Sequence, residues 1–262
     1  MPRRHPPHLL RLAGLAVLVL APLGARAEDP DAAVTPYRPT VSNPAELPVP
    51  GWLEAEFGGL RVFGADHSRA DSVPWLLKYA FDADHGLLLG GDAYVAQDAP
   101  GSASLHGVGD TSLAWKQRFD AGPAGAFGLE AGVTLPSARR GLGVGKPQWQ
   151  ANGIYSRDLG AAHVDVNLGL AHAARHAAGS SAWQQAYAAA LSWPLGSQWG
   201  GALEVSGAHQ RGLPAQAQAL AALNYNVSPR VVLDAGAARG LCHQAHDRSV
   251  FAGATVLLGR LR

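Results

Sequence analysis

The sequence predicts an all-β fold, a transmembrane antiparallel β-barrel of about 12 strands, and three observations predict it. Apolar and polar residues alternate with a period of two along segments of about ten to thirteen residues, roughly what a tilted strand needs to cross a bilayer. Short and long connections alternate along the chain, and aromatic residues gather near the strand ends. Short periplasmic turns, longer extracellular loops and aromatic girdles are typical of bacterial outer-membrane barrels.

Residues 1–27 have the pattern of an export signal. Arg3, Arg4 and Arg11 precede an apolar run that extends to Leu23, and the small residues around Ala27 follow it. The run is shorter than the roughly 20 residues that a membrane-spanning helix needs. We therefore predict a signal peptide that is cleaved near Ala27 during passage through the inner membrane.

The charge of the remaining chain gives no sign of a nucleic-acid partner. Removing residues 1–27 takes away four of the 21 basic residues and none of the 20 acidic ones, which leaves 17 basic residues and a formal charge near −3. Charged residues make up 16% of the sequence, against about a quarter in an average globular protein, and 32 residues are glycine. The single cysteine, Cys242, rules out an internal disulfide.

Residues 28–50 contain six prolines and show no periodicity. Proline fixes φ and has no backbone N–H to donate, so this segment is predicted to be an extended N-terminal extension rather than a strand. The barrel domain then covers residues 51–262. We hypothesise that the extension, or one of the long loops, plugs the barrel.

The periodic part begins at residue 51 and is clearest at 181–210. There Trp183, Tyr187 and Trp193 share one face of a strand, and a Pro-Leu-Gly-Ser turn leads into a second strand. The same segment also fits helical spacing, but the two-residue period recurs along the whole chain and favours strands. The predicted strands are 51–60, 72–82, 85–95, 108–119, 124–135, 147–158, 161–172, 181–193, 197–210, 216–227, 230–240 and 247–258.

Nearly all strand charges fall on one face of these strands. In a membrane barrel that face must point into the lumen, because a charge facing lipid at the midplane costs about 2–4 kcal/mol. In a soluble sandwich the apolar face would instead pack against a second sheet, so alternation alone leaves both folds open. The candidate lumen-lining residues are Glu54, Glu56, Lys78, Asp92, Asp110, Lys116, Arg118, Glu130, Gln150, Asn152, Asp165, Asn167, Glu204, Asn224, Asp234 and Arg248.

The aromatic residues favour the membrane barrel. Strand middles carry Leu, Val, Ala and Gly, whereas aromatic residues flank the short turns and the long loops, as two membrane interfaces require. Those beside short turns are Phe81, Phe119, Phe127, Tyr155, Trp193, Trp199 and Tyr225, and those near long loops are Trp75, Trp149 and Trp183.

Three stretches resemble a known family. They are the segment 43–51 (Asn-Pro-Ala-Glu-Leu-Pro-Val-Pro-Gly), the segment 107–119, in which Gly-Val-Gly-Asp leads to Lys-Gln-Arg-Phe, and the segment 135–143. Together they resemble outer-membrane transporters of the phenol-degradation meta-pathway type. The resemblance implies an outer-membrane barrel that passes small, often aromatic or hydrophobic, compounds. Insertion by the barrel-assembly machinery is also implied, although the chain ends on Leu261-Arg262 where such barrels commonly end on an aromatic residue.

Motifs for cofactors and metals are weak. A phosphate-binding loop fails because Pro147 follows Gly145-Lys146 where Ser or Thr is needed. His172 with His176, and Cys242 with His243 and His246, lie in or beside predicted loops and lack a second ligand pair with zinc-site spacing. The sequence therefore predicts neither a cofactor nor a metal site.

An outer-membrane lipid hydrolase is the enzyme alternative. It needs a serine hydroxyl within hydrogen-bond reach of a histidine that a third group orients. His67 and Ser68 are adjacent and so point to opposite sides of an extended chain. The other histidines considered, His163, His172 and His209, have no serine at an evident matching cross-strand height. We therefore predict no enzymatic activity.

The sequence thus predicts a monomeric outer-membrane conduit whose partners are the lipid bilayer, the assembly machinery and a small-molecule solute. A barrel of about 12 strands has an intermediate bore. We expect it to be narrowed by pairs formed by Lys78, Lys116 and Arg118 with Asp110, Glu130 and Asp92. Two alternatives remain open, a non-transporting barrel that acts as scaffold or adhesin, and a soluble secreted β protein.

Overall fold

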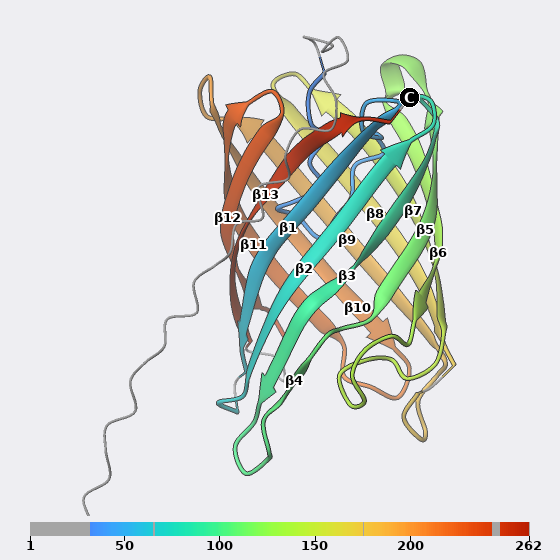
Figure 1. Cartoon of the computed structure of the whole chain (residues 1–262), viewed down its shortest axis with the longest axis vertical. Coiled ribbons are helices and arrows are strands. Elements are labelled where there is room, and N and C mark those ends of the chain that lie inside the picture. The colour runs from blue at the N-terminus through green and yellow to red at the C-terminus, as the bar shows by residue number, and fades with distance from the viewer. Residues whose placement is uncertain (1–31, 65, 175, 243–246, 262) are drawn as a thin grey trace, which may run out of the picture.

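The chain forms one closed antiparallel barrel (Figure 1) in a computed structural model that describes residues 32–64, 66–174, 176–242 and 247–261. The predicted signal peptide, 1–27, lies outside the described residues. The elements are β1 (Trp52–Phe63), β2 (Arg69–Ala80), β3 (His85–Asp98), β4 (Leu105–Gly107), β5 (Thr111–Asp120), the short 3₁₀ helix η1 (Gly122–Ala124), β6 (Ala126–Leu135), β7 (Gln148–Leu159), β8 (Ala162–Ala173), β9 (Trp183–Pro194), β10 (Trp199–Gln210), β11 (Gln216–Ser228), β12 (Val231–Gly240) and β13 (Arg248–Arg260).

Sequential neighbours pair around the whole circumference, and β1 pairs with β13 to close the wall. Twelve long strands form the barrel, which confirms the predicted fold class and the twelve strand positions. The additional β4 is a three-residue strand that pairs only with β3. Antiparallel closure pairs each of the twelve long strands on both sides, which a wall surrounded by lipid requires.

The predicted strand 108–119 is interrupted at its start. Residues 108–110 leave the ladder because the Gly109 N–H donates to the Asp92 carbonyl at 2.9 Å. A Cβ atom on Gly109 would lie 2.6 Å from the Asp92 Cβ, so only glycine allows the two segments to come this close. The strand observed here, β5, therefore begins only at Thr111, and the separate β4 ends at Gly107.

The two ends of the barrel differ. At one end the strands are joined by short turns, such as 81–84, where the Asp82 carboxylate accepts the backbone N–H groups of Asp84 and His85 at 2.8 Å each. These bonds, the Asp84 N–H first and the contact with the His85 ring next, lower the pKa of Asp82. β1 begins and β13 ends at this same end, since Trp52 pairs with Arg260. We call it the short-turn end and the opposite end the long-loop end.

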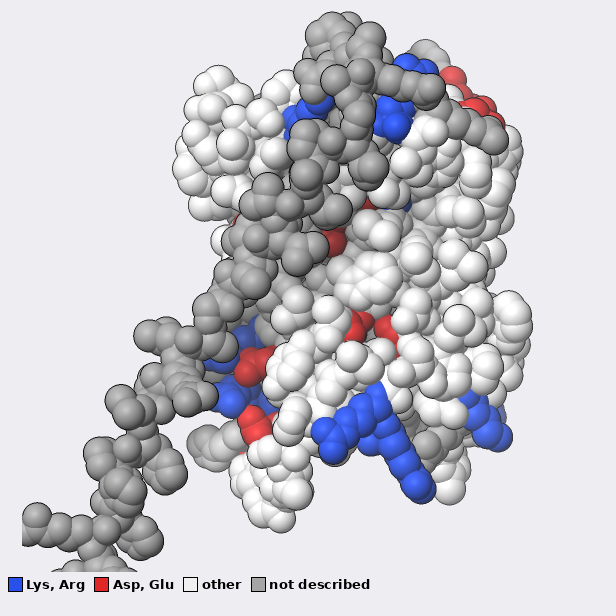
Figure 2. All heavy atoms as spheres, in the orientation of Figure 1, with Lys and Arg blue, Asp and Glu red and all other residues white. Residues whose placement is uncertain are grey.

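The outside of the barrel is apolar. Large aliphatic and aromatic side chains from every sector are exposed there, including Phe57, Val73, Leu89, Leu113, Leu129, Leu168, Leu191, Leu203, Leu223, Leu233 and Val250. Figure 2 shows that Lys and Arg on the viewed face lie toward its two ends, with mainly uncharged atoms between them. An apolar surface of this extent is stable against hydrocarbon and not against water.

Aromatic residues ring the short-turn end as predicted. The Trp199 and Tyr225 rings lie 4.8 Å apart across β10 and β11, and the Phe127 and Tyr155 rings lie 5.1 Å apart across β6 and β7. Trp199 is 50% exposed, so it is not sealed between two sheets. The soluble-sandwich alternative is therefore wrong. Among the described residues, no helix is long and apolar enough to cross a membrane.

Candidate functional site

The lumen is filled over its short-turn half by residues 32–50, which we call the plug. Figure 1 shows this N-terminal segment, in blue, inside the barrel. It starts beside the junction of β1 and β13, where Ala32 packs on Trp52 and Leu257. It returns to the same end, where the Gly51 N–H donates to the Ala80 carbonyl at 2.8 Å. The described part of the N-terminal extension thus lies inside the barrel, as the plug hypothesis expects.

Backbone N–H groups of the plug bind carboxylates of the wall. Thr35 N–H donates to Glu54 at 2.9 Å and Tyr37 N–H donates to Glu56 at 2.6 Å, both on β1. On the far side of the lumen, the N–H groups of Val41 and Ser42 each donate to the Glu204 carboxylate of β10 at 2.8 Å. Because the plug belongs to no sheet, its buried N–H groups need such acceptors, and the inward acids provide them.

Two buried lysines hold the ring of Tyr37. The Lys78 and Lys116 ammonium nitrogens lie 3.8 Å and 4.0 Å from the centre of the ring, within cation–π range. The Lys116 ammonium donates to the Pro44 carbonyl at 2.6 Å, and the Tyr37 hydroxyl donates to the Glu46 carbonyl at 2.8 Å. These contacts fix the middle of the plug on charged groups of β2 and β5.

Arg38 attaches the plug to the opposite side of the wall. Its guanidinium makes two hydrogen bonds to the Asp234 carboxylate of β12, at 2.9 Å and 2.8 Å. Gly58 and Gly253 make room for it, because a Cβ on either would lie within 2.8 Å of the guanidinium. A bidentate pair in this setting is geometrically specific as well as strong.

The structure corrects most of the expected ion pairs. Lys116 does bind Glu130, at 3.1 Å, but Lys78 binds Glu54 and Glu56 at 2.6 Å each instead of Asp92, Asp110 or Glu130. The reason is register, since Glu54 lies directly beside Lys78 on neighbouring strands.

Arg118 is likewise paired differently. It binds Asp120 at 3.2 Å and contacts Asp84, both at the short-turn mouth, because it stands at the end of β5. Asp110 accepts the N–H groups of Ala138 and Val144 at 3.0 Å and 2.6 Å, so it anchors the long loop 136–146 instead of a lysine.

Other candidate residues lie as follows. Several of the candidates are buried on the lumen side of the wall. They are Asp165, Asn167, Glu204 and Asp234, together with Lys78, Lys116 and the acids that bind these lysines. Asp92 lies beside the 108–110 crossing, and Asn224 lies inside, next to Gly200. Arg248, at the long-loop end of β13, lies beside Phe63 and Arg239 in the sheet on the same face as exposed Val250, and it borders the mouth of the cavity.

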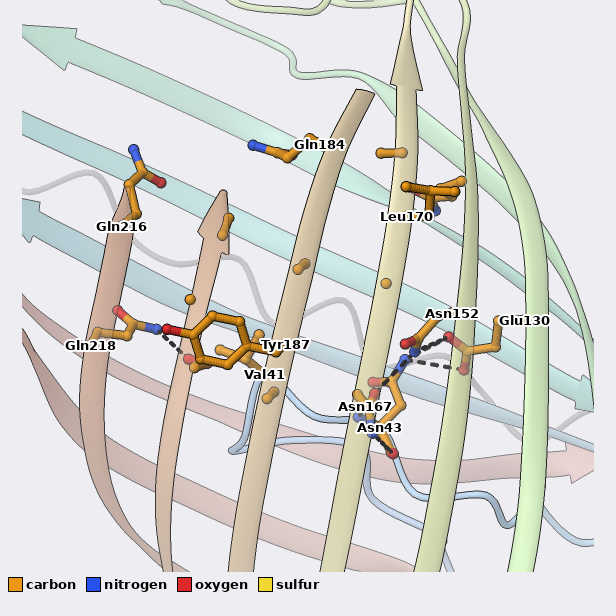
Figure 3. Close-up of a pocket in the computed structure, with 18 of the residues that line it drawn as sticks. Val41, Asn43, Glu130, Asn152, Asn167, Leu170, Gln184, Tyr187, Gln216 and Gln218 are labelled. Atoms are coloured by element: carbon orange, nitrogen blue, oxygen red, sulfur yellow. Dashed lines mark hydrogen bonds between the residues drawn. The ribbon is translucent and has the colours of Figure 1, made fainter. Parts of the chain in front are cut away.

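Between the plug and the long-loop end lies a cavity of about 680 Å³. Val41 and Asn43 of the plug form its floor. One side of its wall is apolar, with Val62, Leu76 and Leu88 from β1, β2 and β3. The other side carries side-chain amides, shown in part in Figure 3, from Gln148, Gln150, Asn152, Asn167, Gln184, Gln216 and Gln218.

A hydrogen-bonded cluster joins the floor of the cavity to its amide side (Figure 3). The Asn43 side-chain amide donates to both oxygens of Glu130, at 3.1 Å and 3.0 Å. Asn152 donates to Glu130 at 3.2 Å and to Asn167 at 2.9 Å. The Glu130 carboxylate is thus occupied by amide donors and by Lys116. Of the glutamines on this side, Gln218 donates to the Ser206 hydroxyl at 3.3 Å.

Charge is scarce around this cavity. Among the described lining residues the charged ones are Glu130 at the floor and Asp247 and Arg248 at the rim. No row of lysines or arginines therefore lies in the described wall of the cavity. Its chemistry is that of neutral hydrogen-bonding groups facing an aliphatic surface, which suits an uncharged molecule with one polar and one apolar side.

The hydrolase arrangement is not formed by the described contacts. Ser192 does lie directly across from His163, contrary to the expectation that no serine matches its height. However, the His163 ring contacts Asp158 and Asp165, and the Ser156 hydroxyl donates to Asp165 and accepts the Ala45 N–H. A serine nucleophile needs its hydroxyl on the histidine, not on the carboxylate.

The loop histidines weighed as metal ligands do not come together in the described part of the chain. His172 packs edge-on against Trp183, with ring centres 4.7 Å apart, and the His176 ring is near the Ala173 carbonyl. The candidate set at Cys242 involves His243 and His246, which lie outside the described residues.

A closed 12-stranded wall with an apolar exterior and a polar lumen defines the fold of the chain as an outer-membrane β-barrel. Solved structures with this fold include the COG4313 outer membrane channel from Pseudomonas putida F1, at 14% identity and a TM-score of 0.61, over 81% of this chain and 97% of that one. The NanC porin matches at 8% identity and a TM-score of 0.58, over 78% and 100%.

The KdgM porin in complex with disordered oligogalacturonate matches at 10% identity and a TM-score of 0.52, over 79% of this chain and 99% of that one. No family model matches the chain. No curated protein matches it either. At these identities the likeness concerns the fold.

Sequence reasoning missed several plug residues that make the site. Tyr37, Arg38, Ser42 and Asn43 lie in the aperiodic, proline-rich segment, and each contacts residues that are distant in the sequence. The one available signal was an excess of inward acids over inward cations, which indicates that something else must bind those acids.

Proposed function

We propose that this protein is an outer-membrane channel for small, uncharged molecules that combine an aromatic or hydrophobic part with a hydrogen-bonding group. The observation that carries the proposal is the cavity above the plug, with its neutral amides facing an aliphatic wall. The resemblance to transporters of the phenol-degradation type points to the same class of solute. The protein would work as a monomer, without a cofactor, after export and insertion by the barrel-assembly machinery.

The plug makes passage conditional in this proposal. A solute enters from the long-loop end, exchanges water for the glutamine amides and rests on Val41 and Asn43. It can continue only if the plug shifts, because the plug occupies the lumen below. The channel would therefore show a low basal conductance with occasional openings.

Charge separates this solute class from acidic saccharides. The KdgM porin is known in complex with oligogalacturonate, a polyanion. Binding a polyanion requires cationic groups along its path, and both lumen lysines of this chain, Lys78 and Lys116, are fully buried under the plug. We therefore expect neutral solutes to be preferred over anionic ones.

Uptake into proteoliposomes tests the proposal with a neutral phenyl glycoside, which crosses lipid slowly by itself, and with galacturonate as the anionic probe. We expect faster entry of the phenyl glycoside. Gln218→Arg should shift the preference toward the anion, because Gln218 lines the cavity and the substitution adds a cation there. Leu203→Met, on the exposed outer face, is the matched control and should behave like the native chain.

Two outcomes would contradict the proposal. Equal entry of both probes would show that the cavity does not select by charge. Entry of neither probe, in protein shown to be folded, would favour the second candidate function, a non-transporting scaffold or adhesin. That candidate is favoured by one observation, namely how firmly the plug is attached on several sides of the lumen.

A further inference from the structure

A cluster of potential metal-ligating side chains lies at the short-turn mouth, away from the cavity. It consists of Glu46 of the plug with His163 and Asp165 of β8, whose potential ligand atoms all lie within 4.8 Å of one another. Asp158, at the end of β7, contacts the other ring nitrogen of His163. This cluster plays no part in the proposed channel function.

The orientation of the His163 ring is the informative detail. Its Nδ1 lies 2.6 Å from the Asp158 carboxylate, which accepts the ring N–H there. In a neutral imidazole this leaves Nε2 as a lone pair, and Nε2 lies 3.2 Å from an Asp165 oxygen, also a lone-pair atom. Two lone pairs at this distance need a cation between them, either a proton or a metal ion.

One separation between potential ligand atoms matches a metal site, that between His163 and Asp165. Ligands at about 2.0–2.1 Å in a tetrahedral zinc site lie about 3.3–3.4 Å apart, close to the separation of Nε2 and the Asp165 oxygen. A carboxylate that holds the far nitrogen of a ligating histidine, as Asp158 holds His163, is the usual support of such a site. The cluster has three carboxylates and one imidazole, so a proton on the imidazole leaves two negative charges uncompensated.

The nearby cations are bound directly to other acids, and Lys116 acts on Glu46 only at longer range. In the part of the chain that the structure describes, Lys78 and Lys116 bind Glu54, Glu56 and Glu130, and Arg38 binds Asp234. None of these pairs includes Glu46 or Asp165. The His163 side chain is 30% exposed and Asp158 is 82% exposed, so an ion can reach the cluster from the short-turn side.

We infer that Glu46, His163 and Asp165 form a binding site for a divalent transition-metal ion such as Zn²⁺, with Asp158 positioning His163. An imidazole with two carboxylates favours zinc over calcium or magnesium, which prefer oxygen ligands throughout. Because Glu46 belongs to the plug and the other ligands belong to the wall, the bound ion links the plug to β8. The site is therefore a metal-dependent fastening of the plug.

The experiment uses the full mature chain, purified in detergent without a histidine tag and treated with a chelator. Zinc is then titrated at neutral pH by calorimetry, with Co²⁺ as a second probe whose visible absorption reports the ligand geometry. We expect one zinc ion per chain. His163→Gln should abolish binding, and Asp158→Asn should weaken it by about 10–100-fold, as loss of a supporting carboxylate does.

His209→Gln is the matched control, because His209 is an exposed histidine on β10 outside the cluster. It should bind zinc like the native chain. Heat-dependent mobility in gels verifies that each variant is a folded barrel. Equal zinc affinity in native and His163→Gln protein, or no zinc binding by folded native protein, would overturn the inference.

Glu46→Gln tests the link to the plug. It should weaken zinc binding, and zinc should slow amide hydrogen exchange in residues 32–50 of the native chain but not of this variant. Unchanged affinity in Glu46→Gln would show that the ion does not reach the plug. These readouts involve no solute, so their outcome is independent of the channel function.

Discussion

Replacing Arg38 by alanine should release the plug without unfolding the barrel. Its guanidinium makes two hydrogen bonds with Asp234, and their side chains are only 18% and 2% exposed. Removing one partner of a buried pair costs about 3–5 kcal/mol, because the other charge stays buried without compensation. This cost falls on the docked state, since Asp234 is hydrated whenever the plug leaves.

The expected change is large enough to measure directly. At about 1.4 kcal/mol for each factor of ten, the equilibrium between docked and released plug should shift by about two to three and a half orders of magnitude. Hydrogen exchange of the plug amides reports this equilibrium, because Tyr37, Val41 and Ser42 donate to wall carboxylates only when the plug is docked. Channel openings in planar bilayers should become more frequent.

Arg61→Ala is the control for this prediction. Arg61 forms an ion pair with Asp71 at 2.6 Å, but its side chain is 49% exposed, and such pairs contribute about 0–1 kcal/mol. Plug exchange should be unchanged in this variant. If Arg38→Ala leaves the plug as protected as in the native chain, the wall carboxylates do not hold the plug in the way described.

Three further predictions concern Lys116, the plug as a whole and the outer face of the barrel. Lys116→Met should speed exchange around Pro44, because it removes the ion pair with Glu130 and the bond to the Pro44 carbonyl; unchanged protection by mass spectrometry would contradict this. Deleting residues 32–48 should give an open, cation-selective pore, because the acids at 54, 56, 130, 165, 204 and 234 then outnumber the inward lysines; a reversal potential near zero across a salt gradient would refute it. Leu168→Lys should destabilise the inserted barrel by about 2–4 kcal/mol in urea titrations, because Leu168 is 68% exposed on the outer face near mid-strand, whereas Gln218→Lys in the lumen should be tolerated; equal losses would mean that the two faces are assigned the wrong way round.

The strands of the wall could be predicted from the sequence, because the face of each strand residue depends only on its position within that strand. Each strand must alternate between lipid and lumen, so Leu168 and Asn167 reveal their faces without knowledge of their neighbours. The girdle residue Trp199 was placed for the same reason, since position along a strand sets depth in the membrane. The pairing of sequential strands could be predicted as well, because two strands joined by a short turn lie next to each other.

The plug could not be read in this way. Many of its contacts are made by backbone N–H groups, which every residue except proline carries, so nothing in the residue types of 32–50 indicates that Ser42 meets Glu204, 162 residues later. The partners in the ion pairs could not be predicted for a related reason. Alternation places Lys78 on the same face as the acids but does not show which acid lies beside it, because register depends on turn geometry that alternation does not encode.

The metal-binding cluster could not be predicted from the sequence, and both reasons apply to it. His163 is a strand residue like any other, and Glu46 lies in the aperiodic segment. Ligand spacing within the sequence identifies sites built from one or two neighbouring elements, and this one joins the plug to the wall. Only the folded arrangement brings the three groups within reach of one ion.

The path of the plug also affects how the barrel can be assembled. Residues at its start contact both strands of the junction that closes the cylinder, since Ala32 packs on Trp52 of β1 and on Leu257 of β13. Arg38 then reaches β12, on the far side of that junction. The leading segment therefore bridges the two strands whose pairing closes the cylinder, and separating the first strand from the final one would also have to break its contacts.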